Sequence, residues 1–135
     1  MGIQTMSNQE ASESTSPQGA LPADVLTAEQ KDFFWANGYL VFENAVTDEL
    51  LSLLRGDFAA WVDESRTHND AYGVTINNHP RFDLEAGHSA AHPALRRVNA
   101  PIEVSDAFHK ATVDSAMTDA VASLVGPDVK LHHTK

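Results

Sequence analysis

The chain has 135 residues, one domain's worth at most, and its apolar fraction of 42% allows only a modest core. Its formal net charge of −10 repels phosphate backbones, so we expect no nucleic-acid partner. The absence of cysteine excludes disulfides, thiolate metal sites and a cysteine nucleophile, and no run of residues approaches the ~20 apolar positions that span a bilayer, so we expect no membrane partner.

Residues 1–22 are rich in Ser, Gln, Gly and Pro and carry no Lys or Arg. Such a segment buries too little apolar surface to offset the entropy of ordering, so we expect a disordered tail. It has neither the basic and apolar regions of a secretory signal nor the arginines of a transit peptide, which favours a cytoplasmic protein. The predicted helices and strands all lie within residues 23–135.

The first predicted helix begins after Thr27, where Thr27 and Gln30 have the spacing of a capping box. It ends at Asn37-Gly38, because glycine accepts the left-handed conformation that terminates a helix. The run that follows, residues 39–42, is apolar and aromatic, and it predicts a short, largely buried strand.

A second helix is predicted from Thr47, a good N-cap, to about Glu64. Its apolar side chains recur at helical spacing from Leu50 to Trp61, and we interpret them as a face that packs in the core. The long segment 65–93 is full of Asn, Gly, His and Pro, and it is predicted to be a loop with a short strand at residues 74–76.

Three further elements are predicted in the last third of the chain. Residues 95–98 are predicted to form a short strand. Ser105 caps a third helix that ends at Gly126-Pro127, a strong stop signal. Residues 129–135 are predicted to be a final strand.

Two groups of histidines have features of metal ligands. His68 and Asp70 form an H-x-D pattern, which contributes two ligands to the facial triad of non-haem iron enzymes. Here the pattern lies in a polar loop, and we interpret both as loop residues, as we do His88. Adjacent residues of a strand point to opposite faces, so His132 and His133 are not expected to chelate one ion. A small metal-binding protein that uses His68, Asp70 and one C-terminal histidine remains an alternative hypothesis.

The ordered set of elements resembles a known family. The stretch LTAEQKDFFWANGYLVFENAVTDELLSLL is similar to the N-terminal signature of the phytanoyl-CoA dioxygenase family. The later HPALRRVN, the helix SDAFHKATVDSAMTDAVASLVGPDV and the terminal KLHHTK fall where that family has comparable elements. The resemblance covers roughly residues 24–135.

The resemblance implies an α+β fold: N-terminal helices and the first strands of a double-stranded β-helix, or jelly roll. It also implies a non-haem dioxygenase that uses Fe(II) and 2-oxoglutarate to hydroxylate a small organic molecule. In the family, the iron ligands follow the strand that corresponds to KLHHTK. We therefore expect residues 23–135 to be the N-terminal part of such a domain, truncated before the triad, with no catalytic or metal-binding residue, no tightly bound cofactor and no activity alone.

Two basic residues are the candidate cofactor contacts. The resemblance places Arg97 and Lys135 against 2-oxoglutarate, and a cation suits a dicarboxylate. A surface ion pair is the alternative for Arg97. For the whole chain, the alternative to an oxygenase fragment is a small non-catalytic α/β binding or interaction module.

Overall fold

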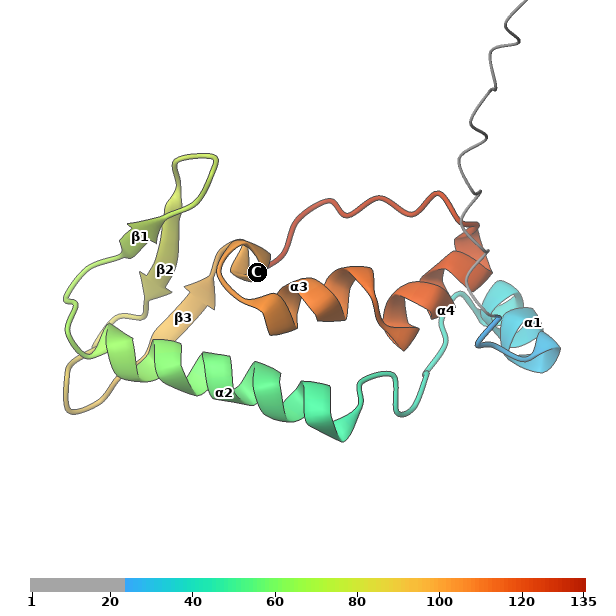
Figure 1. Cartoon of the computed structure of the whole chain (residues 1–135), viewed down its shortest axis with the longest axis horizontal. Helices are drawn as coiled ribbons and strands as arrows, with labels where there is room; N and C mark the ends of the chain where they lie inside the picture. Colours follow the sequence, from blue (N-terminus) through green and yellow to red (C-terminus); the bar gives the residue numbers. More distant parts are fainter. Residues whose placement is uncertain (1–23) are drawn as a thin grey trace, which may run out of the picture.

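The computed structural model describes residues 24–135, so the tail predicted at residues 1–22 lies outside the described residues. Figure 1 shows helices at one end and along the length of the molecule, with a small sheet at the other end. The α+β class is confirmed. In chain order the elements are α1 (Ala28–Asn37), α2 (Asp48–Ser65), β1 (Tyr72–Val74), β2 (Pro80–Leu84), β3 (Leu95–Val98), the 3-10 turn η1 (Pro101–Glu103), α3 (Asp106–Val113) and α4 (Ala116–Val125).

Helix α1 begins and ends as the sequence predicts. The Thr27 hydroxyl accepts a hydrogen bond from the Gln30 backbone, and the Gln30 side chain accepts one from the Thr27 backbone. Gly38 ends the helix at a φ of 80°. The strand predicted at residues 39–42 is wrong, because no described strand lies beside this segment to pair with it. Val41 is accordingly 71% exposed rather than buried.

Helix α2 is confirmed, with the Thr47 hydroxyl accepting a hydrogen bond from the Leu50 backbone at 3.2 Å. Leu50 and Trp61 are buried on its inner face. None of the helices between residues 24 and 135 combines the length and the apolar character that crossing a bilayer requires.

The sheet is antiparallel, in the order β1-β2-β3. The strand predicted at residues 74–76 lies two residues earlier, as β1, and the strand at 95–98 is confirmed as β3. Strand β2 lies inside the segment predicted to be loop, which is a correction. A tight turn joins β1 to β2: Asn78 takes a φ of 61°, the Thr75 N–H donates to the His79 carbonyl, and the Thr75 carbonyl accepts from the Asn78 N–H.

A bulge in β3 sets the direction of its side chains. Asp83 pairs with Arg97 and Leu84 pairs with Leu95, so Arg96 is an additional residue between two consecutive steps of β2. Leu95 and Val98 can therefore both pack on the core. Without the bulge, alternation along the strand would place them on opposite faces.

The core lies where α2, α3 and the sheet meet. Trp61 of α2 packs against Phe82 of β2, with ring centroids 6.0 Å apart, and against Phe108 of α3 at 5.2 Å. Val98 completes the buried cluster, and Tyr72 packs against its edge. This cluster fixes the sheet against the two helices.

The helix predicted from Ser105 to Gly126 is two helices, α3 and α4, with a break at Asp114-Ser115. The Ser105 cap is confirmed, since its hydroxyl accepts from the Phe108 backbone at 3.0 Å. At the break, the hydroxyls of Ser115 and Thr118 donate to the carbonyls of residues 111 and 112. Those carbonyls are the ones that a continuous helix would bond through its backbone, so the side chains compete with helix continuation.

The strand predicted at residues 129–135 is also wrong. This segment has no regular structure and returns from α4 past α3, so that the chain ends beside η1 (Figure 1). The Ala100 N–H donates to the Thr134 carbonyl at 3.0 Å, a single bond where a strand would need a ladder. The rings of His132 and His133 approach each other through their Nδ1 atoms, so the expected opposite orientation is wrong as well.

Candidate functional site

A cleft of about 620 Å³ lies between the β1–β2 turn, the end of β3, η1 and the last residues of the chain. Arg97 and Lys135, the two residues predicted to contact a dicarboxylate, both line it. They come from elements far apart in the sequence, and the return of residues 127–135 past α3 brings them together. Neutral polar groups from Thr75 and Asn99 also line the cleft.

Arg97 forms an ion pair with Asp83, its register partner on β2, at 3.8 Å between Nη1 and Oδ2. The ion pair that was the alternative for Arg97 is therefore present. The distance is long, and the two side chains are 38% and 28% exposed. A pair of this kind contributes less than about 1 kcal/mol, so a ligand carboxylate can replace Asp83 at little cost.

Arg97 and Lys135 also border a second, smaller pocket of about 350 Å³. Its walls include the aromatic rings of Phe58, Trp61 and Phe108. Arg96 borders this pocket as well. Arg97 and Lys135 thus stand between the cleft, whose lining is both polar and apolar, and this more apolar pocket. The arrangement can hold an anionic group beside an apolar one.

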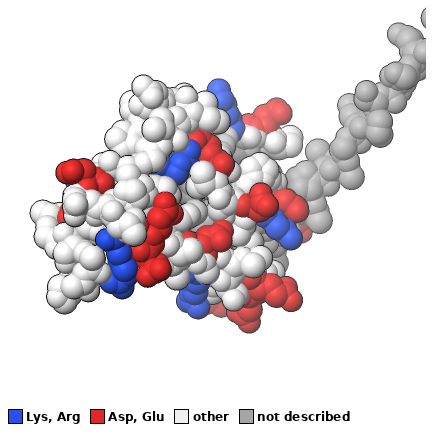
Figure 2. Space-filling model, turned by 60° about the vertical axis from the view of Figure 1, so that its left-hand side comes forward, with Lys and Arg blue, Asp and Glu red and all other residues white. Residues whose placement is uncertain are grey.

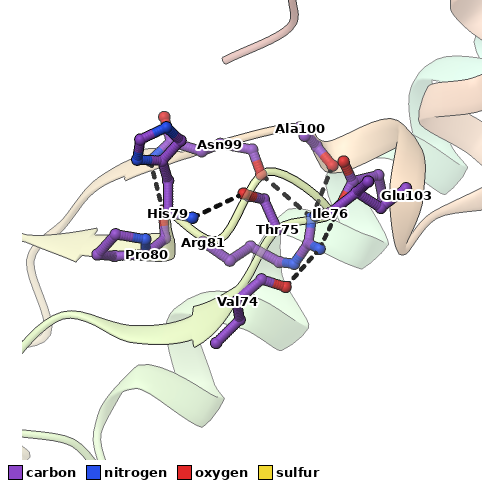
Figure 3. Close-up of polar contacts among 9 residues, drawn as sticks. All are labelled: Val74, Thr75, Ile76, His79, Pro80, Arg81, Asn99, Ala100 and Glu103. Carbon is purple, nitrogen blue, oxygen red and sulfur yellow. Dashed lines mark hydrogen bonds and ion pairs between the residues drawn. The ribbon is translucent and has the colours of Figure 1, made fainter.

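Arg81 does not line the cleft itself but lies behind residues that do, and Figure 3 shows its guanidinium between β1 and the turn after β3. Its side chain is only 7% exposed. Nη2 donates to the Val74 carbonyl at 2.9 Å and to Glu103 at 2.5 Å, and Nη1 donates to the carbonyls of Asn99 and Ala100 at 3.2 and 2.8 Å. Sequence reasoning missed this residue. The alternation of Phe82 and Leu84 is the signal that could have placed Arg81 in a strand.

Glu103 completes the network around Arg81. Its Oε2 accepts from the Arg81 guanidinium and from the Ile76 backbone at 3.1 Å. The hydrogen bond from Arg81 is the main cause that holds the pKa of Glu103 below its usual range, which keeps the carboxylate ionised. Every acceptor around the buried cation is therefore either a carbonyl or a charged carboxylate.

His68 packs against an aromatic ring and does not belong to any cluster of metal-binding side chains among the described residues. Its ring stacks on Tyr72, and residues 24–135 contain no group of three His, Asp or Glu side chains arranged to hold a metal ion. The described residues therefore do not fit an iron centre. His79, His132 and His133 border the cleft with the two basic residues.

His88 is a structural residue rather than the loop-surface residue that the sequence predicts. Its Nδ1 accepts from the Ala94 N–H at 2.9 Å, so its Nε2 carries the proton and donates to the Ser65 carbonyl at 3.0 Å. The ring joins the end of α2 to the segment before β3. It therefore helps to hold β3, and with it Arg97, in place.

Acidic and basic side chains are interspersed on the face drawn in Figure 2. The net charge of −10 opposes the approach of an anion, so the binding of one depends on the basic groups within the cleft. Comparison of the chain with protein-family models, with curated proteins and with solved structures found no match.

Proposed function

We propose that the chain is the N-terminal part of a cytoplasmic non-haem Fe(II)/2-oxoglutarate-dependent dioxygenase that hydroxylates a small organic molecule. Its helices and strands would open a jelly-roll domain like that of the phytanoyl-CoA dioxygenase family, which the sequence resembles. One observation carries the proposal: Arg97 and Lys135, selected from that resemblance, line one cleft.

The chemistry of the cleft supports 2-oxoglutarate as the ligand of these two residues. A dicarboxylate presents two anionic groups, and an arginine fork binds a carboxylate through two parallel hydrogen bonds. Asp83 is the acidic neighbour of Arg97, and its long ion pair offers weak competition. The cleft, at about 620 Å³, falls in the range of small-molecule sites.

The described residues supply no iron site for this proposal. Because residues 24–135 do not fit a metal centre, we assign none of them to iron. The iron ligands are expected in sequence that follows these elements, and the 135 residues by themselves are expected to be inactive.

The test uses the protein purified from its source cells, with variants introduced at the native locus. Mass spectrometry of its peptides should find sequence that runs past Lys135. With Fe(II) and O₂, the protein should convert 2-oxoglutarate to succinate. The loss of one charged fork in Arg97→Ala should raise the KM for 2-oxoglutarate by about tenfold or more.

Arg96→Ala is the matched control. Arg96 is the neighbouring arginine and forms a comparable ion pair with Glu85 at 3.6 Å. It borders the smaller apolar pocket but does not line the cleft to which the dicarboxylate is assigned. Its KM should stay within about twofold of the parent value, as expected for an exposed ion pair. The absence of succinate, or equal KM values for the two variants, would contradict the proposal.

A non-catalytic interaction module is the second candidate, and the surface of α4 favours it. This helix buries only Ala120, while Met117, Val121 and Val125 are exposed on it. Exposed apolar side chains on one helix are typical of a contact surface. A cooperative thermal melt of the 135-residue chain, together with no succinate from the native protein, would support the module instead of the enzyme.

A further inference from the structure

Arg81 does not line the cleft, yet three of its hydrogen-bond partners do: Asn99, Ala100 and Glu103. We propose that Arg81 is a positioning residue: through Ala100 and Thr134, its guanidinium sets where Lys135 stands. The identity of the ligand rests on the function proposed above, whereas the positioning of Lys135 rests on hydrogen bonds alone.

The first step is the set of hydrogen bonds by which Arg81 fixes the turn after β3. One guanidinium nitrogen of Arg81 donates to two successive carbonyls, those of Asn99 and Ala100. The Asn99 N–H donates back to the Arg81 carbonyl at 2.7 Å, and the Asn99 side-chain amide donates to the Pro80 carbonyl at 2.8 Å. Because the guanidinium is planar and buried, these partners fix the position of the turn.

The second step is the conformation of Ala100. Its φ of 49° and ψ of 54° are left-handed, which costs a non-glycine residue about 1–2 kcal/mol. Such a conformation persists only where the surroundings impose it. Here the Ala100 carbonyl accepts from Arg81 at 2.8 Å and from the Glu103 backbone N–H at 3.0 Å, and the two bonds together supply that constraint.

The third step leads from Ala100 to the end of the cleft. In its left-handed conformation, Ala100 donates its N–H to the Thr134 carbonyl. Within residues 24–135, this is the one hydrogen bond that joins the segment 127–135 to a different element. Lys135 follows Thr134 directly, so the place of its backbone, from which the side chain enters the cleft lining, depends on this bond.

The test compares Arg81→Lys with Arg96→Lys in the full protein. Lysine keeps the charge of Arg81 but loses the fork, so it cannot reach carbonyls on both sides at once. Arg96→Lys makes the same change at an exposed position of the bulge. Amide hydrogen exchange measured by NMR should be about tenfold faster at Ala100 in Arg81→Lys and unchanged in Arg96→Lys, with the amides of α2 unchanged in both.

The enzymatic readout separates positioning from general loss of structure. Arg81→Lys should raise the KM for 2-oxoglutarate about tenfold and leave kcat within about twofold, whereas partial unfolding would lower kcat and leave KM unchanged. In a Lys135→Ala background, the same change should alter KM by less than about twofold, because the residue through which Arg81 acts is then absent.

Each outcome decides one proposal. Unchanged exchange at Ala100 in folded Arg81→Lys overturns the positioning role, as does an equal effect on KM with and without Lys135. If the native protein forms no succinate, the oxygenase proposal fails while the exchange rates still decide the positioning role. If Arg81→Lys does not fold, Glu103→Gln replaces it: faster exchange at Ala100 is expected, and unchanged exchange overturns the proposal.

Discussion

The imidazole of His68 lies flat on the ring of Tyr72, with the ring centroids 3.6 Å apart and the planes inclined by 6°. Tyr72 stacks in turn on Phe82 of the core at 4.7 Å. The three rings form one stack from the end of α2 into the sheet. His68 thus belongs to the packing of the sheet, although the sequence presents it in a metal-like pattern with Asp70.

The stack predicts the result of His68→Ala. Loss of the aromatic pair should lower the free energy of unfolding by about 0.5–1.5 kcal/mol, measured by urea titration. The affinity for Zn(II) should not change, since the ring has a structural role. His92→Ala is the control, because His92 lies exposed in the same segment. A loss of Zn(II) affinity in His68→Ala alone would revive the hypothesis of a metal-binding protein.

Tyr72→Phe should leave the protein as stable or more stable at pH 7, because the buried Tyr72 hydroxyl has no hydrogen-bond partner. Burial, with a contribution from Glu64, raises the pKa of Tyr72 to about 12. A raised pKa in the folded state gives stability that is present below the unfolded pKa of about 10 and lost as the pH rises. The parent should therefore lose stability between about pH 10 and 12. Urea titrations across this range should show a smaller loss in the variant.

Gly73→Ala should be strongly destabilising. Gly73 has a φ of 67°, and a Cβ there would lie 3.2 Å from Cβ of Arg81 and from the Phe82 ring. The left-handed conformation alone costs about 1–2 kcal/mol for alanine, and the contacts add to it. Gly56→Ala is the matched control: its Cβ meets nothing within 4 Å, and alanine should stabilise α2 by about 0.5–1 kcal/mol. Thermal melts that shift in the same direction for both variants would refute this account.

Ser105→Ala should cost about 1–2 kcal/mol, more than an ordinary cap, because the hydroxyl both caps α3 and donates to Asp57 of α2. Ser115 stands at the same position of α4, but its hydroxyl donates to Ala111 and does not cap. Ser115→Ala should therefore cost less. Chemical denaturation of both variants checks the difference.

Glu103→Gln tests the charge beside Arg81. The lowered pKa of Glu103 means that its contribution to stability is present above its unfolded pKa and lost as the pH falls through the folded value. The parent should therefore lose stability in acid below about pH 4.3, and the variant should lose less over the same range. Urea titrations at pH 7 and pH 3 give the two slopes. Equal slopes would show that Glu103 does not contribute.

The elements that sequence patterns predicted correctly have local signals. Hydroxyls at Thr27, Thr47 and Ser105 cap helices through bonds that span three residues, so the printed sequence contains both partners. The strands predicted at residues 39–42 and 129–135 failed because a strand depends on a remote neighbour, which no apolar run reveals. Strand β2 was missed for the same reason. It forms by pairing with β1 and β3, and its own composition does not indicate a strand.

The candidate site divides in the same way. The resemblance selected Arg97 and Lys135, and the structure places them in one cleft, while their role in binding 2-oxoglutarate stays a prediction. The sequence did not point to Arg81, because sequence alone does not distinguish a buried arginine from one in an exposed loop. What distinguishes it is the set of carbonyls around it, and these come from two separate segments, the end of β1 and the turn after β3.

Strand β3 contains one residue more than its pairing with β2 uses, and the inward-facing residues of the strand do not depend on that extra residue. Removal of Arg96 would leave Leu95, one arginine and Val98 in simple alternation, so the two apolar side chains would still face inward. The remaining arginine would keep Asp83 as its register partner. A one-residue deletion at this point therefore spares the core and the pairing of Arg97, and it removes only the ion pair between Arg96 and Glu85.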